Sequence, residues 1–436
     1  MTSLLIQGGR VISPADGIDA ELDVLVEGDA IRAVGPRLGA RAGQTLDARG
    51  QVVAPGFVDL HVHLREPGGE ASETLETGLA AAVAGGFTAV CPMPNTRPVN
   101  DSPELTRRLT ERAASVGLAR VFPIAAVSAA SEGETLTDFP ALVAVGAVAF
   151  SDDGRPVKTA ALMRAALIVA RELGAPVIDH CEDPGLSAGG AVNRGPVAER
   201  LGVRGIPAAS EEVCLARDLI LAEGTGGRFH AAHLSTADSV EMVREAKRRG
   251  VRVTCEVTPH HFTLTDEAVG RYGTQAKMNP PLRGALDVEA ILGGLADGTI
   301  DAMATDHAPH APELKQRPLA EAPFGVIGLE TALGLALRLV HGGRLSLGQL
   351  VSLMSANPGR IIGQSSDRVA RRCLGRITAG GPADLTVFDP NLEWTYRAAV
   401  GRSKSRNSPF DGWTFKGAVT ATIVAGKIVY RRGVGD

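Results

Sequence analysis

The clearest pattern in the chain is a series of eight short apolar runs, each of which ends in polar or ionisable side chains. They cover residues 53–64, 87–95, 119–127, 144–153, 175–183, 227–235, 251–261 and 300–310. Helical signals fill the gaps: one helix is expected from the Ser102 cap and Pro103 to Gly117, and another from about Thr236 to Gly250. Eight strands that alternate with helices predict an α/β fold, a (β/α)8 TIM-like barrel with its chemistry at the C-terminal strand ends.

The two ends of the chain have a different pattern. Residues 1–52 and 365–436 alternate short apolar strands with glycine and aspartate turns. We therefore expect a small β-sandwich built from the N- and C-terminal segments, flanking a barrel over residues 53–364. The chemical motifs lie outside this sandwich, so its expected role is structural.

Composition narrows the function classes. The 436 residues include 45 Lys and Arg against 49 Asp and Glu, a formal charge of −4, which gives no electrostatic case for nucleic acid or an anionic membrane as a partner. No apolar stretch approaches the roughly 18 residues that a membrane span needs, and the N-terminus lacks the basic region of a signal peptide. Five scattered cysteines predict reduced thiols and a cytoplasmic protein. Cys91, Cys181 and Cys255 are expected to fill the core.

Histidines collect where the barrel rule predicts chemistry. Eight of the ten lie at or just past predicted strand ends: His61, His63, His180, His233, His260, His261, His307 and His310. His61 and His63 are two residues apart on an extended segment, so their side chains share a face. Together with His180, His233 and Asp306 they predict a shared metal site. Imidazoles with carboxylates favour zinc, with manganese or cobalt as alternatives.

These residues also carry a resemblance. The His-x-His on the first strand, single histidines on the fifth and sixth and an aspartate on the eighth are similar to the amidohydrolase superfamily. The motifs DLHVHLREPG, MPNT, FSDDG, DHCED, KMNPPLR, TDHAPH and APFGVIGLET resemble those of the bacterial class I dihydroorotases over nearly the whole chain. The resemblance implies two zinc ions: one on His61, His63 and Asp306, the other on His180 and His233, with Asp153 bridging them.

The bridging position departs from many relatives of that superfamily, which use a carboxylated lysine at the end of strand 4. This chain has no lysine there before Lys158, so a carboxylate must take the place. Asp152 and Asp153 point to opposite faces of an extended segment, and strand alternation alone does not choose between them. The resemblance favours Asp153, and Asp152 is then expected to cap a loop.

The resemblance implies a reaction as well: the reversible, zinc-dependent interconversion of N-carbamoyl-L-aspartate and L-dihydroorotate in pyrimidine (UMP) biosynthesis. A hydroxide shared by the two metals would be the nucleophile. Asp306 would be the catalytic residue that takes its proton and passes it to the leaving nitrogen.

Substrate recognition requires a cation for the ring carboxylate. Arg65 lies two residues past His63 and would clamp that carboxylate if the strand continues. The resemblance adds His63, Asn95, Asn279, His310 and the backbone of Phe324 and Gly325 as substrate-binding residues. From the residues alone, the alternative interpretation of Asn95 is a turn residue and that of His310 is a solvated loop histidine.

Several other segments have simpler expectations. His260 and His261 are adjacent and cannot both point inward as ligands, so a packing or hydrogen-bonding role is expected. His307 is expected to face away from the metals. The basic residues 402–406 are expected to form a solvated surface loop. Residues 310–325, long and rich in proline for such a connection, are expected to be a lid that orders over substrate.

Two other functions compete with this interpretation. A hydantoinase or dihydropyrimidinase opens related cyclic amides, but Arg65 and the missing bridging lysine argue against it. A catalytically inactive subunit that scaffolds aspartate transcarbamoylase is expected to lose metal ligands, and none is missing here. The sequence leaves open whether an active enzyme associates with aspartate transcarbamoylase and whether it forms a homodimer.

Overall fold

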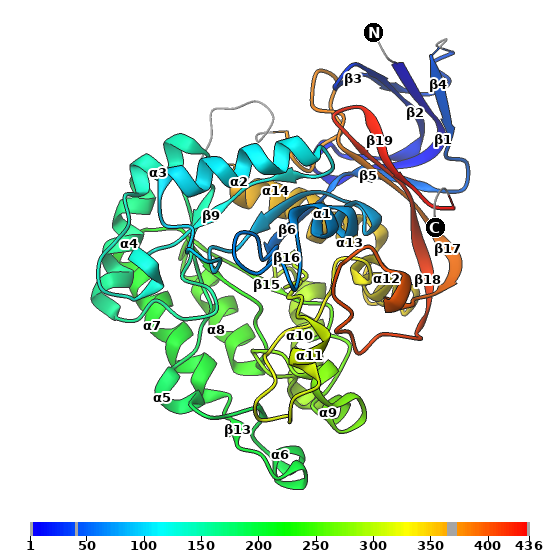
Figure 1. Cartoon of the computed structure of the whole chain (residues 1–436). Helices are drawn as coiled ribbons and strands as arrows, with labels where there is room; N and C mark the ends of the chain where they lie inside the picture. The colour runs from blue at the N-terminus through cyan, green and yellow to red at the C-terminus, as the bar shows by residue number, and fades with distance from the viewer. Residues whose placement is uncertain (1–2, 40–41, 364–372, 434–436) are drawn as a thin grey trace.

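The computed structural model describes residues 3–39, 42–363 and 373–433. The predicted domain boundary at residue 365 lies outside these ranges. The two ends of the chain, blue and red in Figure 1, lie together on one side of the molecule, and most of the helices lie on the other. No helix within the described ranges is long and apolar enough to cross a membrane.

Each of the eight predicted runs contains a parallel strand. The strands are β6 (Phe57–Val62), β7 (Phe87–Pro92), β8 (Arg120–Val121), β9 (Ile124–Ala125), β10 (Ala149–Phe150), β11 (Val177–Asp179), β14 (Phe229–Ala231), β15 (Val253–Val257) and β16 (Ala302–Met303). They form two sheets, ordered β6-β7-β8 and β16-β15-β14-β11-β10-β9. β8 and β9 are consecutive pieces of one run. A parallel bridge between Val62 and His307 brings the last strand beside the first, and the His63 N–H donates to the His307 carbonyl at 2.8 Å.

The first run proved to be two strands rather than one. β5 (Val52–Pro55) pairs with β1 (Ser3–Ser13) and β17 (Leu385–Thr395) of a separate mixed sheet, and β6 begins only at Phe57. Gly56 separates them where the backbone passes so close to Thr88 that a Cβ atom at Gly56 would lie 1.9 Å from the Thr88 Oγ1. The break therefore comes from close packing, which the apolar pattern does not reveal.

Helices follow most of these strands. They are α1 (Leu75–Ala84), α2 (Pro103–Val116), α3 (Phe139–Val145), α4 (Ala160–Glu172), α5 (Pro184–Ser187), α6 (Pro196–Leu201), α7 (Ala209–Thr225), α8 (Ala237–Arg248), α9 (Glu267–Tyr272), α10 (Ala285–Asp297), α11 (Pro312–Lys315), α12 (Ala332–His341), α13 (Leu347–Val351) and α14 (Asn357–Gly363). Both predicted helices are confirmed: Ser102 Oγ accepts from the Leu105 N–H and Gly117 ends α2 in the left-handed region, while Thr236 caps α8. β6 and β7 are buried along their whole length, as expected for parallel strands covered on both faces.

The flanking strands of both chain ends meet in one mixed eight-stranded sheet, ordered β19-β18-β17-β5-β1-β2-β3 with β4 on β1. Its strands are β1 (Ser3–Ser13), β2 (Ile18–Glu27), β3 (Ala30–Gly35), β4 (Gln44–Asp47), β5, β17 (Leu385–Thr395), β18 (Thr414–Val424) and β19 (Lys427–Arg431); a separate pair is β12 (Val192–Asn193) with β13 (Gly205–Ile206). Thr386 and Thr422 donate their hydroxyls to the carbonyls of Gly86 and Val83, each at 2.6 Å, and so attach this sheet to the α1–β7 region.

Candidate metal centre and substrate cavity

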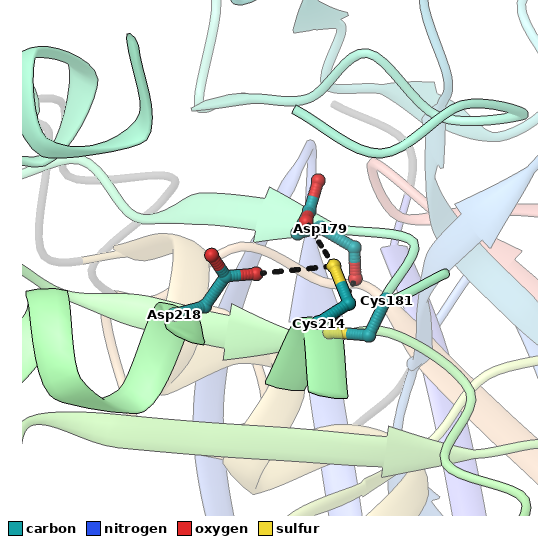
Figure 2. A group of neighbouring side chains, drawn as sticks. All are labelled: Asp179, Cys181, Cys214 and Asp218. Atoms are coloured by element: carbon teal, nitrogen blue, oxygen red, sulfur yellow. Dashed lines mark hydrogen bonds between the residues drawn. The ribbon is translucent and has the colours of Figure 1, made fainter. Parts of the chain in front are cut away.

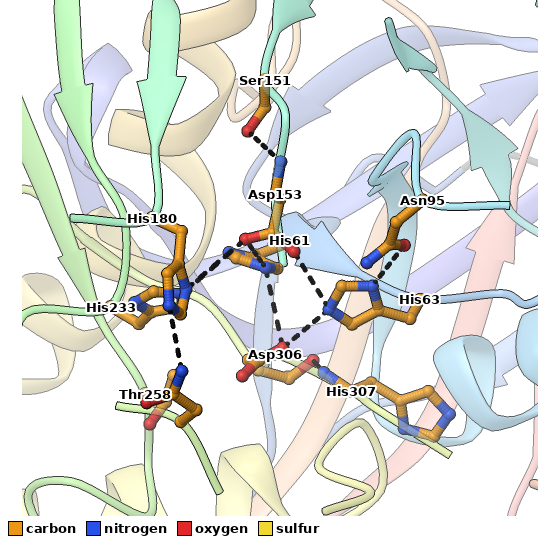
Figure 3. Close-up of polar contacts among 12 residues, drawn as sticks. His61, His63, Asn95, Ser151, Asp153, His180, His233, Thr258, Asp306 and His307 are labelled. Carbon is orange, nitrogen blue, oxygen red and sulfur yellow. Dashed lines mark hydrogen bonds and ion pairs between the residues drawn. The ribbon is translucent and has the colours of Figure 1, made fainter. Parts of the chain in front are cut away.

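The six side chains predicted as metal ligands lie together, although they come from five different strand ends (Figure 3). His61 is on β6 and His63 follows it. The other four come just after β10, β11, β14 and β16, in the order Asp153, His180, His233 and Asp306. All six side chains are buried. The C-terminal ends of parallel strands meet at one edge of the sheet. His61 and Asp306, which are 245 positions apart in the sequence, therefore become neighbours.

Asp153 lies in the middle of this group. Its Oδ1 is 3.3 Å from His61 Nε2, 3.8 Å from His233 Nε2 and 3.9 Å from His180 Nδ1. Its Oδ2 is 3.6 Å from His63 Nε2. One carboxylate thus faces both pairs of histidines.

Asp306 lies beside the first pair only. Its Oδ1 is 3.0 Å from His63 Nε2 and 3.6 Å from His61 Nε2. On the opposite side, His180 Nδ1 and His233 Nε2 are 3.0 Å apart. The donors therefore divide into two groups, with Asp153 between them.

The unsatisfied atoms of the group test whether it suits a cation. His61 Nε2 and Asp153 Oδ1 are fully buried and have no hydrogen-bond partner among the described residues, although they face each other. Leaving buried polar atoms unpaired is costly, and a metal ion would satisfy both. Imidazole nitrogens and carboxylate oxygens are also the donor types that zinc takes. The residues present fit a metal centre.

The electrostatics keep both carboxylates ionised. Burial opposes charge on Asp153, but His61 and the neighbouring histidines hold the pKa of its carboxyl well below the usual value. Burial opposes charge on Asp306 as well, and His61 and His63 again lower the pKa. Two anionic carboxylates beside four histidines suit a divalent cation.

The neighbouring Asp152 has another role. Its carboxylate accepts from the Ser128 N–H at 3.0 Å and from the Ser128 hydroxyl at 2.6 Å, and so caps that loop. Adjacent residues of an extended segment point to opposite sides, and here the side that faces the histidines belongs to Asp153.

Glu256, on β15, was missed by the sequence analysis. Its Oε1 is 2.9 Å from His61 Nδ1, and its Oε2 is 3.2 Å from His230 Nε2; His230 Nδ1 in turn is 2.8 Å from the Thr254 hydroxyl. With Nδ1–H donated to Glu256, the lone pair of His61 is on Nε2, directed at the carboxylates. The signal in the sequence was an acidic residue inside the apolar run 251–261.

Beside the metal group lies a cavity of about 180 Å³. This volume suits a ligand smaller than a typical drug. Every residue predicted to bind substrate lines it. The lining consists of His63, Arg65, Asn95, Asp153, Gly154, His180, His233, Asn279, Asp306, Ala308, His310, Phe324 and Gly325.

Arg65 brings a positive charge to this cavity. Its Nε donates to the Pro309 carbonyl at 3.1 Å, its Nη2 lies 3.5 Å from His310 Nε2, and it forms no ion pair with any described carboxylate. Burial lowers the pKa of its guanidinium to about 10, which leaves it charged at neutral pH. A half-buried cation that forms no ion pair among the described residues, with donors left over, suits an anionic group of a ligand.

Three of these residues adopt backbone angles that side chains seldom take. Arg65, His233 and Asp306 have φ values of 62°, 28° and 46°. Such strain persists only where the surroundings impose it, and it collects at functional sites. Asp59 supplies part of that constraint, because its carboxylate accepts from the backbone N–H groups of both His61 and Thr305.

The remaining lining residues have defined partners. Asn95 Oδ1 is 3.0 Å from His63 Nδ1, and Asn279 Nδ2 is 3.2 Å from His180 Nε2. His310 Nε2 lies 2.7 Å from the Phe324 carbonyl and therefore carries the hydrogen. The Gly325 N–H donates to the Lys277 carbonyl at 2.9 Å.

The other histidines lie around the group. His261 contacts the Thr258 hydroxyl and the Pro280 carbonyl. His260 is buried beside it, and its Nε2 has no hydrogen-bond partner in the part of the chain that the structure describes. His307 pairs with Glu73 at 3.2 Å, away from the two carboxylates (Figure 3).

The expectation of a solvated basic loop at residues 402–406 was wrong for its two serines. Ser403 and Ser405 are each 1% exposed, and they donate hydrogen bonds to the Glu73 carboxylate and the Ser72 carbonyl. The basic side chains reach solvent: Lys404 and Arg406 are exposed and Arg402 is half-buried. The alternation of serine with basic residues places one set inward and the other outward.

A second group of possible ligands, Asp179, Cys181, Cys214 and Asp218, lies between β11 and α7 (Figure 2). Its carboxylates are already paired: Arg217 Nε is 2.7 Å from Asp218 Oδ1 and its Nη2 is 3.3 Å from Asp179 Oδ2. Both thiols are buried. With a guanidinium in place of a metal ion, this cluster is a packing and charge-pairing element.

Known proteins with a similar structure agree with this geometry. Among solved structures, an L-hydantoinase (dihydropyrimidinase) from Arthrobacter aurescens superimposes with a TM-score of 0.88 and 26% identity, over 100% of this chain and 97% of that one. A D-hydantoinase from Thermus sp. gives 0.82 and 28%, over 99% and 97%. Fold and site thus define a member of the amidohydrolase superfamily.

The particular family follows from closer relatives. A family model described as "Dihydro-orotase-like" matches residues 50–239. A dihydroorotase of Geobacter sp. (strain M21) is 50% identical over 432 residues, 99% of this chain and 100% of that protein. A dihydroorotase of Pelobacter propionicus is 51% identical over 431 residues, again 99% and 100%. The chain belongs to the dihydroorotase family.

Proposed function

We propose that this protein is a dihydroorotase that interconverts N-carbamoyl-L-aspartate and L-dihydroorotate in pyrimidine biosynthesis. The observation that carries the proposal is the combination, in one cavity of about 180 Å³, of a buried histidine–carboxylate group with the ion-pair-free Arg65. The first suits hydrolysis of a cyclic amide and the second suits a carboxylate on the ring. Full-length relatives that carry the name dihydroorotase support it.

The architecture proposed for this site is one closed (β/α)8 barrel with a small β-sandwich beside it. Support for closure comes from the Val62–His307 bridge and from β8 and β9, which link the two parallel sheets. The mixed sheet of β1–β5 and β17–β19 would be the sandwich. The strands of such a barrel all run in the same direction, so the strand ends that carry the site lie together at the C-terminal end of the barrel.

The proposed cofactor is a pair of zinc ions. His61, His63 and Asp306 would hold one, His180 and His233 the other, and Asp153 would bridge them. When bound, such ions lower the pKa of a water molecule and polarise the amide carbonyl.

The chain's own residues supply the remaining steps. Hydrolysis adds water across the ring C–N bond. Asp306, ionised and facing the cavity, would accept the proton of the attacking water and deliver it to the ring nitrogen as the C–N bond breaks. In the reverse direction it would take that nitrogen's proton and return it with the departing water. Arg65 would hold the ring carboxylate and so orient the amide toward the histidines.

The hydantoinase alternative rests on the structural likeness at 26–28% identity. Hydantoin and dihydrouracil carry no carboxylate, so with those rings bound the half-buried Arg65 would have no anionic partner. The scaffolding alternative is weakened because every predicted ligand is present and buried. Association with an aspartate transcarbamoylase and self-association are proposals that sizing of the purified protein, alone and with that partner, would test.

The direct test is hydrolysis of L-dihydroorotate by the zinc-loaded protein, with dihydrouracil and hydantoin assayed beside it and N-carbamoyl-L-aspartate followed by chromatography. We expect opening of dihydroorotate, and closure of N-carbamoyl-L-aspartate at lower pH. Turnover of only the uncharged rings would assign a hydantoinase. Absence of activity on all three substrates with zinc bound would favour the scaffolding role.

A further inference from the structure

A segment from the C-terminal part of the chain contacts the loops that line the cavity. Residues 402–407, here called the C-terminal strap, follow β17 and precede β18 of the mixed sheet. The strap leaves that sheet and packs against the loops that line the substrate cavity. Its last residue, Asn407, is only 3% exposed.

The Asn407 side chain uses its acceptor and both of its donors. Its Oδ1 accepts from the His310 N–H at 3.1 Å, and its Nδ2 donates to the carbonyls of Ala308 at 2.9 Å and Gly325 at 3.0 Å. Its backbone carbonyl accepts from the Ile327 N–H at 2.9 Å. A single amide thus joins the two ends of the connection that runs from residue 308 to residue 325.

The three residues held by this side chain all line the cavity. His310 lies beside Arg65 and contacts the Phe324 carbonyl, so a shift of its backbone would move the neighbours of the guanidinium as well. Gly325 has little freedom to compensate, since a Cβ at that position would lie 2.6 Å from Ala308 Cβ. Asn407 itself does not line the cavity.

Other residues of the strap form hydrogen bonds on the same side of the cavity. Ser405 Oγ donates to the Ser72 carbonyl at 2.6 Å, and the Ser72 hydroxyl accepts from the Ala311 N–H at 3.1 Å. The Lys404 N–H donates to the Glu73 carboxylate at 2.9 Å. None of these contacts involves a predicted metal ligand.

We propose that Asn407 is a positioning residue for substrate recognition, which fixes the backbone at Ala308, His310 and Gly325 and thereby the geometry around Arg65. The inference rests on the proposed function, because its kinetic test uses dihydroorotate as the substrate. It predicts an effect on substrate affinity that leaves the metal centre intact, because the metal ligands are held by separate contacts.

The test compares Asn407→Asp with wild type. The change is nearly isosteric, but it removes both N–H donors and places a carboxylate against two carbonyls. Asn407→Ala serves as a second variant without the added charge. Asn391→Asp is the matched control, because Asn391 is an exposed residue of β17.

For zinc-loaded Asn407→Asp and Asn407→Ala we expect KM for dihydroorotate to rise about tenfold or more, with kcat within about threefold of wild type. Metal content and the CD spectrum should match wild type, and Asn391→Asp should be unchanged in all of these. A KM within about twofold of wild type for both variants would overturn the proposal, as would a fall in kcat that follows loss of metal.

Amide hydrogen exchange gives a readout independent of turnover. Peptides that cover residues 308–311 and 324–327 should exchange faster in both Asn407 variants and not in Asn391→Asp. Unchanged exchange there would contradict the positioning role. If wild type itself fails to turn over dihydroorotate, the proposed function fails, and the exchange result still decides whether Asn407 holds these loops.

Discussion

The two sides of the cavity are built in different ways. On the metal side, the working groups are side chains at strand ends, and they face one another directly: Asp153 contacts all four predicted histidine ligands within 3.9 Å. On the substrate side, the working groups are carried by loops, and their positions depend on side chains that contact the backbone carbonyls of those loops.

Two buried lysines show this second design. Lys315 Nζ donates to the carbonyls of Pro323 and Gly325 at 3.0 and 2.9 Å, and Lys277 Nζ donates to those of Leu319 and Ala322, each at 2.6 Å. Burial lowers the pKa of Lys277 to about 8, and burial together with the charge of Lys277 lowers that of Lys315 to about 7. The lid predicted for residues 310–325 stays a prediction, and its opening would have to break these contacts.

Because the two sides are held by different contacts, catalysis and substrate selectivity are separable in this site. Substitutions on the metal side should abolish turnover of any cyclic amide. Substitutions on the substrate side should instead change which ring is accepted and how tightly that ring binds.

The largest effect is expected at Asp153. Asp153→Asn removes the one carboxylate that faces both histidine pairs, so zinc content should fall and kcat/KM should drop by at least about a thousandfold. Zinc analysis and the dihydroorotate assay check this. Asp152→Asn is the control, because Asp152 caps the Ser128 loop; it should keep its metal. Equal metal loss in both variants would remove the distinction drawn between the two residues.

Next in size is Arg65. Arg65→Met should lower kcat/KM for dihydroorotate by about a hundredfold, mostly through KM, since it removes the cation for the ring carboxylate. Zinc content should stay at the wild-type level, and Arg65→Lys should recover part of the loss. Arg97→Met, at an exposed position, is the matched control. An unchanged KM in Arg65→Met would show that the carboxylate binds elsewhere.

A smaller effect is expected at Glu256. Glu256→Gln keeps the shape of the side chain but weakens the hold on His61 Nδ1–H, so zinc affinity should fall by about 10- to 100-fold. Competition with a chromophoric chelator measures this directly. Glu393→Gln, exposed on β17, should leave the affinity unchanged. Wild-type zinc affinity in Glu256→Gln would reduce Glu256 to a packing role.

The smallest predicted effect is on pH-dependent stability. Burial, together with the charge of Arg65, lowers the pKa of His310 to about 3. Because the folded pKa lies below the unfolded value of 6.5, the folded state binds fewer protons between these values, and stability is lost as pH falls below 6.5. Relative to His310→Asn, wild type should lose roughly 2 kcal/mol between pH 8 and pH 5. Urea unfolding of both proteins at each pH checks this; a constant difference would contradict it.

The same division explains how much could be predicted from the sequence. The metal side was accessible because strand ends of parallel sheets converge, so histidines and aspartates from five of the eight runs could be assigned to one place. The substrate side was accessible only in part. Asn407 acts on Ala308, 99 residues away, and Lys277 on Ala322, 45 residues away, through backbone carbonyls that leave no local pattern. The break at Gly56 was hidden for the same reason, since it depends on packing against Thr88.

The central claim, that the buried histidine–carboxylate group is a two-metal catalytic centre, is tested most directly by metal removal and return. The wild-type protein would be stripped with a chelator and titrated with zinc while dihydroorotate hydrolysis and bound metal are followed together. We predict an inactive but folded apoprotein whose activity returns and reaches its plateau at two equivalents of zinc per chain. Full activity without metal, or a plateau at one equivalent, would contradict the account.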